Sequence, residues 1–361
     1  MLRTCVCAPS ARRYRTRRTP PDRRANSRRD VPQVSFIHEY PAAMNTDAIA
    51  TLQQQLVGAL SSPPNETRRL FHGRGQRWPG LEHVTADWLQ GLLLVCLFRQ
   101  PAASELLALK QMLLALSESP EWQRSGAQHL LLQHRYLPDS STEFLLGEPV
   151  DEWLISEGGL RYKLDLGKKQ NNGLFLDMRY GRRWVQAQAQ GKRVLNLFAY
   201  TCGFSVAAIA GGASHVVNLD MARAALSRGR DNHRLNQHDL SKVSFLGHEL
   251  FKSWGKVKSC GPYDLIIIDP PSFQKGSFAL TQDYQKILRR LPDLLSEQGT
   301  VLACINDPST GPEFLIEGMA TQAPSLVFAE RLENPPEFAD INPDSGLKAL
   351  LFVQAVHCAA P

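Results

Sequence analysis

The sequence predicts an α/β protein with a seven-stranded, Rossmann-like sheet preceded by a small α+β domain. From about Gly173 onward, strongly apolar segments alternate with helical segments, which indicates an open parallel sheet covered on both faces. Three of the apolar segments end in residues that can bind ligands: a turn with one glycine, an acid at Asp220, and Asp269-Pro270-Pro271-Ser272-Phe273. Ligands of such sheets bind beyond the carboxyl ends of the strands, so the sequence predicts a site there.

Residues 1–43 differ in composition from the rest of the chain. They hold ten arginines and three acids, a net charge of +7, which leaves about −1 for the remaining residues of a chain whose formal charge is +6. This segment is poor in large aliphatic residues and is expected to be a disordered tail. It can be interpreted as an RNA-binding arm, an organelle transit peptide, or a segment absent from the functional protein. We favour the last, with translation starting at Met44, just before the first helical pattern.

Residues 44–170 are expected to form the small α+β domain, with residues 171–361 as the second domain. A helix is predicted over residues 46–60 with Thr46 as its N-cap, and another over residues 104–119. Short strands joined by Gly and Pro turns are predicted between residues 69 and 98. A hairpin is expected to turn at Gly158-Gly159.

The second domain supplies the predicted strands of the large sheet. They cover residues 193–198, 215–220, 242–246, 263–269, 300–305, 326–332 and 349–356. Helices are predicted between most of them, for instance over residues 222–235 and 281–295.

Composition excludes several classes of protein. No apolar run reaches the roughly 18–20 residues that a membrane span needs, and residues 88–98 indicate a buried strand or hairpin. The seven cysteines form no CxxC pair, so neither a disulfide framework nor a metal site is predicted. These features favour the reducing cytoplasm.

The turn after the first predicted strand of the large sheet limits the choice of cofactor. Residues 199–203 contain one glycine and match neither GxGxxG nor a P-loop, so a cofactor without phosphates fits better than a dinucleotide, and an ordinary turn remains an alternative. Asp220 could accept the hydroxyls of a ribose or cap the next helix. Residues 248–250 could supply a polar contact to an adenine or form a surface turn.

Residues 269–273 carry the sharpest signal for chemistry. Pro270 and Pro271 stiffen the chain directly after a buried strand and leave the carbonyls of Asp269 and Pro270 as fixed acceptors. Phe273 offers a face on which a base could stack. The motif therefore suits a planar, nitrogen-bearing substrate, and the alternative is a rigid strand exit with Phe273 in the core.

Several motifs in order give the chain a family resemblance over residues 66–358. They are LFHGRG, PGLEHVTADWL, NNGLFLDMRYGRRWV, VLNLFAYTCGFSVAA, Asp220, DNHRLN and DPPSF. With them the chain resembles the Rossmann-like S-adenosylmethionine-dependent methyltransferases. More narrowly, it resembles the bacterial large-subunit ribosomal RNA enzymes that make 5-methylcytosine or 7-methylguanine.

The resemblance implies S-adenosylmethionine as cofactor, RNA as partner, and a role for each matching residue. For the methionine and sulfonium part of the cofactor it implies a lining of Phe198, Ala199, Tyr200 and Gly203, with Asp177 and Arg179 at the carboxylate and amine. It implies that Asp220 holds the ribose, that Glu249 lies near the adenine, and that Asn196 and Asp269 also belong to the cofactor site. The residues that it places at the target base are Asp269, Pro270, Pro271 and Phe273.

One departure from the family pattern bears on the base. The 5-methylcytosine enzymes have a nucleophilic cysteine where this chain has Asn306, and Cys304 is expected to lie on the preceding strand and face the sheet. Without that thiolate, carbon 5 of a pyrimidine is not activated, which favours guanine N7 or an amino nitrogen.

Two other function classes remain open. A methyltransferase acting on a protein amide or a small molecule is compatible with the DPP motif and with the nearly neutral charge after residue 43. A non-catalytic RNA-binding relative would keep the fold without the chemistry. The basic pairs Lys168-Lys169 and Arg289-Arg290 favour RNA.

Overall fold

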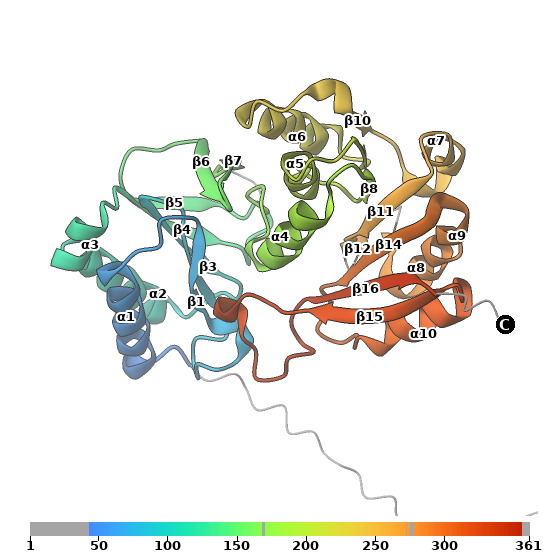
Figure 1. Ribbon diagram of the computed structural model, residues 1–361. Helices are drawn as coiled ribbons and strands as arrows, with labels where there is room; N and C mark the ends of the chain where they lie inside the picture. The colour runs from blue at the N-terminus through green and yellow to red at the C-terminus, as the bar shows by residue number, and fades with distance from the viewer. Residues whose placement is uncertain (1–42, 168–169, 272, 275–277, 356–361) are drawn as a thin grey trace, which may run out of the picture. The chain divides into compact units, whose positions relative to one another are not determined.

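The computed structural model describes residues 43–167, 170–271, 273–274 and 278–355 (Figure 1). Residues 41–361 form one compact unit. The predicted tail therefore lies almost wholly outside the described residues.

The first part of the chain forms a five-stranded sheet in the order β1-β2-β3-β4-β5, in which β3 and β4 are parallel and the other neighbours antiparallel. Leucine-rich faces of three helices pack with one side of this sheet into a core that includes Leu56, Leu93 and Leu113. The elements are α1 (Thr46–Ser61), β1 (Arg68–His72), β2 (Val84–Trp88), β3 (Leu92–Leu97), α2 (Ala103–Ser117), α3 (Pro120–Ser125), β4 (His129–His134) and β5 (Thr142–Leu146).

The predicted hairpin at Gly158-Gly159 is confirmed as the antiparallel pair β6 (Glu152–Glu157) and β7 (Leu160–Asp165). Its buried residues share a cluster with β3, β4 and helix α5 (Gly203–Ala210) of the next part of the chain. Apolar packing thus continues from the small sheet to α5, the helix that follows β8 of the large sheet.

The large sheet has seven strands in the order β10-β9-β8-β11-β14-β16-β15. Its strands are β8 (Arg193–Leu197), β9 (His215–Leu219), β10 (Val243–Leu246), β11 (Tyr263–Ile268), β14 (Leu295–Ile305), β15 (Leu326–Leu332) and β16 (Lys348–Gln354). All seven match predicted segments.

The prediction of an all-parallel sheet was wrong at one edge. The five strands from β10 to β14 are parallel, but β16 is antiparallel to both β14 and β15. No α-helix lies between β15 and β16, both of which are fully described, so the chain returns beside β15 without the crossover that a parallel pair requires.

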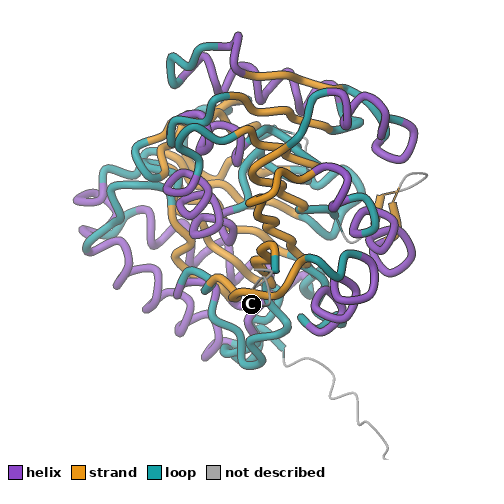
Figure 2. The backbone as a smooth tube through the Cα atoms, turned by 45° about the vertical axis from the view of Figure 1, so that its right-hand side comes forward, coloured by secondary structure: helices purple, strands orange, loops and turns teal. Residues whose placement is uncertain are grey.

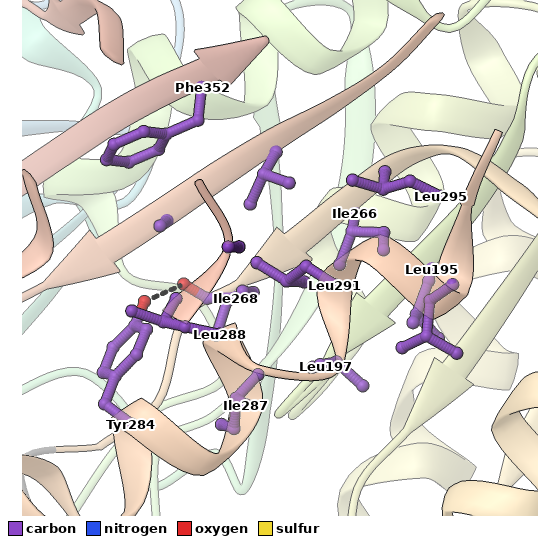
Figure 3. Packing of buried hydrophobic residues seen from close by; sticks show 14 of the residues in the cluster. Leu195, Leu197, Ile266, Ile268, Tyr284, Ile287, Leu288, Leu291, Leu295 and Phe352 are labelled. Atoms are coloured by element: carbon purple, nitrogen blue, oxygen red, sulfur yellow. Dashed lines mark hydrogen bonds between the residues drawn. The ribbon is translucent and has the colours of Figure 1, made fainter. Parts of the chain in front are cut away.

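Helices cover both faces of the large sheet, as the alternation predicts (Figure 2). Along β11, Ile266 and Ile268 join the core formed with α8 and α10, whereas Leu265 and Ile267 join the core formed with α4 and α5. Figure 3 shows part of the first core, where Tyr284 of α8 reaches the carbonyl of Ile268. The helices are α4 (Arg179–Gln188), α5, α6 (Arg223–Leu235), α7 (Trp254–Ser259), α8 (Leu280–Leu288), α9 (Leu291–Leu294) and α10 (Glu313–Gln322).

Two details of the predicted helices were wrong. The N-cap of α1 is Asn45, whose Oδ1 accepts the Ala48 N–H at 2.9 Å, rather than Thr46. The segment 281–295 is two helices separated at Arg289 and Arg290, because Pro292 lacks an N–H and is tolerated in the first turn of α9 but not inside a longer helix.

Among the described residues, no helix is both long and apolar enough to cross a membrane.

Candidate functional site

Three of the predicted site residues directly follow neighbouring strands of the large sheet. Leu197, the last residue of β8, pairs in register with Leu219 on one side and Ile268 on the other. Phe198, Asp220 and Asp269 therefore leave the sheet at the same edge. This is the point where the strand order reverses, since the chain goes from β8 to β9 on one side and later to β11 on the other.

The turn between β8 and α5 has an unusual backbone. Phe198, Tyr200 and Cys202 have positive φ angles of 56°, 48° and 63°, although none of them is glycine. Such left-handed conformations cost roughly 1–3 kcal/mol each in non-glycine residues and tend to cluster at binding and active sites. The backbone of this turn therefore differs from that of an ordinary strand–helix connection.

Asp220 links this turn to the next helix. Its two carboxylate oxygens accept the N–H groups of Tyr200 and Ala222, each at 2.8 Å. Burial raises the pKa of Asp220, while the two N–H groups lower it. Ala222 is the N-cap residue of α6, so Asp220 does not occupy the capping position itself.

A small cavity of about 20 Å³ adjoins Asp220. Phe198, His248 and Glu249 help to line it, which brings residues after β8, β9 and β10 together. Glu249 accepts the Phe251 N–H at 2.7 Å through one oxygen, and its other oxygen lies 3.8 Å from the Nζ of Lys252.

Asp177 and Asp269 form an acidic pair, in which the charge of Asp177 acts on the carboxyl of Asp269. Although part of its side chain is exposed, desolvation, followed by the charge of Asp177, raises the pKa of Asp269 to about 7, and Arg182 opposes this. Desolvation also raises the pKa of Asp177, against the charges of Arg69 and Arg182. Such shifts favour the neutral carboxyl until a cation approaches.

The charge of Arg182 acts on both acids of this pair. It is buried and forms a bidentate ion pair with Glu157 of β6, with N–O distances of 2.7 and 2.8 Å. The pair ties α4 to the hairpin.

A larger cavity of about 590 Å³ opens beside Asp177 and Tyr200. Arg69 of β1, Arg74 in the turn after β1 and Phe98 directly after β3 line it, and so does Asn306 directly after β14. The cavity is thus lined by both sheets.

The remaining predicted residues lie in different surroundings. Arg179 does not line the cavity with Asp177 but pairs with Glu337 at 2.6 Å. Asn196 is buried within the sheet and donates to Asn218 at 2.9 Å. Ala199 is buried.

Gly203 approaches Leu174 and Arg182 so closely that a Cβ there would lie 3.2 and 3.4 Å from their side chains. Pro270 is buried and Pro271 is exposed. Phe273 begins the two-residue strand β12 (Phe273–Gln274), but its side chain lies outside the described residues, and so does the pair Lys168-Lys169.

The expectation for Cys304 is confirmed. The side chain lies on β14 and is fully buried, and burial raises the pKa of its thiol well above the ordinary value. Asn306 lines the larger cavity instead. No group of His, Cys, Asp and Glu side chains in the described part of the chain could hold a metal ion.

Several residues of the site were not assigned a role from the sequence. Arg182 stands in a run of basic residues that reads as a helix surface, and its partner Glu157 is 25 residues away. Phe98, Arg74 and Arg135 come from three segments that meet only in the fold.

Comparison with known proteins agrees with this geometry. The family model described as S-adenosylmethionine-dependent methyltransferase matches residues 68–353. YwbD of Bacillus subtilis, named as a candidate ribosomal RNA large subunit methyltransferase, is 30% identical over 269 residues, 67% of this chain and 61% of YwbD. Ribosomal RNA large subunit methyltransferase I of Aliivibrio fischeri is 30% identical over 219 residues, 58% of this chain and 54% of that protein.

The chain therefore spans a little over half the length of these curated relatives. Among solved structures, SMU.776, described as a candidate methyltransferase complexed with SAH, superposes with a TM-score of 0.74 at 23% identity. The superposition covers 85% of this chain and 81% of that one, which shows a common fold.

Proposed function

The chain belongs to the S-adenosylmethionine-dependent methyltransferases, and on that premise we propose that it methylates a base of ribosomal RNA, at guanine N7 or an amino nitrogen. The observation that carries the proposal is the meeting of the strained turn after β8, the acidic pair, and Asn306 at one edge of the sheet. The relatives named for large-subunit rRNA support the choice of substrate.

The donor set at this edge fits the cofactor. Asp220 and Glu249 border one small cavity and keep acceptor capacity for the hydroxyls of a ribose and the amine of an adenine. Asp177 and Asp269 offer two desolvated carboxylates, which suit the ammonium of the methionine part. The free N–H groups at the start of α5 suit its carboxylate.

When bound, the cofactor supplies a methyl group already activated by the sulfonium, so this chain chiefly has to position the partners. Phe198 packs edge-to-face on Phe278, with ring centroids 5.0 Å apart, which fixes one wall of the turn. Tyr284 donates to the carbonyls of Ile268 and Cys304 at 3.3 and 3.1 Å and so fixes the strand ends that carry Asp269 and Asn306.

Asp269 would accept a hydrogen bond from the target base and orient the lone pair that attacks the methyl group. Pro270 cannot donate, so its carbonyl adds an acceptor without a competing N–H. Guanine N7 needs no deprotonation, and an amino nitrogen needs only orientation, so both routes suit this site.

The burial of Cys304 supports nitrogen over carbon 5. Its thiol is fully buried and its raised pKa keeps it protonated, so it cannot add to a pyrimidine ring. Asn306, which borders the cavity, has no nucleophilic sulfur.

We further assign substrate recognition to residues 44–170, whose five-stranded sheet shares the larger cavity with the cofactor edge. The assignment of Arg179, Asn196 and Phe273 to the site remains a prediction. A cytoplasmic location belongs to the same proposal, since assembled ribosomes and their precursors are found there.

The experiment is transfer of label from radioactive S-adenosylmethionine to rRNA purified from a strain that lacks this protein. Label in the RNA, lost in an Asp269→Asn variant that still binds the cofactor, is the expected result. Nuclease mapping then identifies the base and atom. An unlabelled RNA, with folded and cofactor-bound protein, would contradict purified rRNA as substrate.

One observation favours a second candidate, a methyltransferase for a protein amide or a small molecule. The residues after 43 carry a net charge of about −1, less than expected for a protein that covers much RNA backbone. The test incubates the protein and radioactive S-adenosylmethionine with a whole extract of the strain that lacks it. Label found in the protein or small-molecule fraction, and not in RNA, would favour this alternative. A non-catalytic relative would bind RNA but transfer no label to any fraction.

A further inference from the structure

Two arginines that line the larger cavity, Arg74 and Arg135, form no ion pair with an acid in the described part of the chain. Phe98 carries two guanidinium groups on its ring: the Cζ of Arg74 lies 4.4 Å and that of Arg135 4.8 Å from the ring centroid. All three residues line the cavity. Contact through the aromatic face holds each guanidinium in place and leaves its N–H edge for another partner.

Neither guanidinium has a carboxylate partner within the described part of the chain. No ion pair joins Arg74 or Arg135 to an acid there, and Arg74 makes no hydrogen bond to a described residue. Arg135 donates from one terminal nitrogen to Asn171 at 3.0 Å, while its Nε is buried without a partner. A buried donor of this kind costs stability unless a ligand or water completes it.

Two of the acids that share the cavity are engaged by other residues. Asp87 takes a bidentate pair with Arg69, at 2.6 and 3.0 Å, and Asp340 lies 3.8 Å from His72. At longer range the charges of Asp177 and Asp340 act on Arg74 and that of Asp87 acts on Arg135, but none of these three acids forms an ion pair with either guanidinium.

The stacked pair is held against electrostatic repulsion. Partial burial, followed by the charges of Arg69 and Arg135, lowers the pKa of Arg74. Burial also lowers the pKa of Arg135, with Arg69 contributing. An anion bound at the N–H edges of these arginines would offset this repulsion, and a phosphate offers several acceptor oxygens for them.

The same cavity offers a place for a base. Phe175 is 44% exposed, which is unusual for a large aromatic residue, and its ring lies 5.6 Å from that of Tyr200. Both line the cavity together with Asp177. An exposed aromatic face is the surface on which a base of single-stranded RNA stacks.

We propose that Arg74, Phe98 and Arg135 form a phosphate site that holds one phosphodiester of the RNA strand beside the reacting base. This inference rests on the proposed function for its source of phosphate, but the anion site itself does not. It assigns residues that follow three strands of the five-stranded sheet a direct role in binding the phosphate backbone of the substrate.

The test compares Arg74→Gln with the matched control Arg77→Gln. Both variants remove one exposed arginine from the same short segment, but Arg77 does not line the cavity. Unfolding temperature and S-adenosylmethionine affinity should stay close to the wild type in both, because Arg74 makes no hydrogen bond or ion pair to a described residue and loses only its contact with the Phe98 ring.

For Arg74→Gln we expect KM for rRNA to rise about tenfold with kcat unchanged, as when a charge-assisted contact made before and during the reaction is lost. The slope of log affinity against log salt should fall by roughly 0.7–0.9, the loss of one phosphate contact. Arg77→Gln should change neither. Equal behaviour of the two variants, in an enzyme that methylates rRNA, would overturn the phosphate site while leaving the proposed function intact.

A second measurement is independent of RNA. Inorganic phosphate should protect Arg74 and Arg135 of the wild type from phenylglyoxal, read by mass spectrometry, and should not protect Arg77. If protection is seen but Arg74→Gln binds rRNA like the wild type, the site takes a small phosphorylated molecule and the assignment to RNA is wrong. If phosphate protects neither arginine, the anion site is wrong.

Discussion

Asp269 and Asp177 are desolvated, which favours the neutral carboxyl, yet the proposed reaction needs them as carboxylates. The pKa of Asp269 is about 7, so near neutral pH the pair holds part of a proton in the free enzyme. Binding a cationic cofactor beside it favours the ionised form and expels that proton. The protonation of this pair therefore couples to cofactor binding.

Cofactor binding should accordingly release about half a proton at pH 7, the fraction held by a group that titrates there. Calorimetry in buffers of different ionisation enthalpy measures this release, and affinity should increase as pH rises through 7. The stability of the free protein should change with pH in the opposite direction to cofactor affinity. Because the pKa of Asp269 is raised in the folded state, its contribution to the free energy of unfolding is present at low pH and is lost as pH rises from about 4 to 7. Proton uptake, or a release that persists in Asp269→Asn, would contradict the assignment.

A second prediction at this scale concerns turnover. Asp269→Asn keeps the shape of the side chain but weakens it as an acceptor, so kcat should fall by about 10² or more. Cofactor affinity should fall much less than kcat, since Asp177 remains for the ammonium, and Asp220 and Glu249 remain for the adenosine part. Single-turnover transfer and equilibrium binding separate the two effects. A variant that turns over at the wild-type rate would remove Asp269 from the reaction.

At the scale of elements, the strained turn after β8 is held by close packing of α6. A Cβ added to Gly229 of α6 would lie 2.3 Å from the Sγ and 2.8 Å from the Cβ of Cys202. Cys202 is one of the three turn residues with positive φ. The turn cannot shift without moving the groups at the cofactor edge.

We therefore expect Gly229→Ala to destabilise the protein by about 1–3 kcal/mol, the usual cost of overpacking, and to weaken cofactor binding. Gly58→Ala in α1 is the control, because a Cβ there meets nothing within 4 Å. It should stabilise by roughly 0.5–1 kcal/mol through helix propensity. Chemical denaturation measures both, and equal signs for the two variants would refute this account of the turn.

The buried ion pair between Arg182 and Glu157 fastens the hairpin to α4. Removing one partner leaves a buried charge, so Arg182→Met should destabilise by about 3–5 kcal/mol. The double variant with Glu157→Leu should recover part of that loss, because no unpaired charge remains. A double-mutant cycle by chemical denaturation tests this. If the double variant loses as much as the sum of the single variants, the two side chains are not coupled.

At the scale of the whole molecule, the sequence predicted all seven strands of the large sheet, because buried strands leave apolar runs that need no knowledge of their partners. It could not predict the antiparallel β16, since strand direction depends on the connection from β15 rather than on apolar content. The carboxyl-edge residues Asp220 and Asp269 could be predicted from their place after strands. The Arg74–Phe98–Arg135 stack could not, because its members meet only when distant segments fold together.

Packing contacts cross the predicted domain boundary at residue 170. One buried cluster contains residues of β3 and β4, of the hairpin, and Val206 and Ala207 of α5. Polar contacts follow the same path, since Asn232 of α6 accepts the Lys163 N–H of β7 at 2.9 Å. A shortened chain of residues 171–361 would expose this face of α5 and α6.

We therefore expect the intact protein to unfold in one calorimetric transition, with calorimetric and van't Hoff enthalpies equal. The shortened chain should fail to bind S-adenosylmethionine, because the helix that follows the strained turn loses its cover. Differential scanning calorimetry and equilibrium binding measure the two properties. Two separate transitions, or a shortened chain that folds and binds the cofactor, would show that the large sheet is autonomous. In that case the small sheet would contribute to the substrate alone and not to the stability of the cofactor edge.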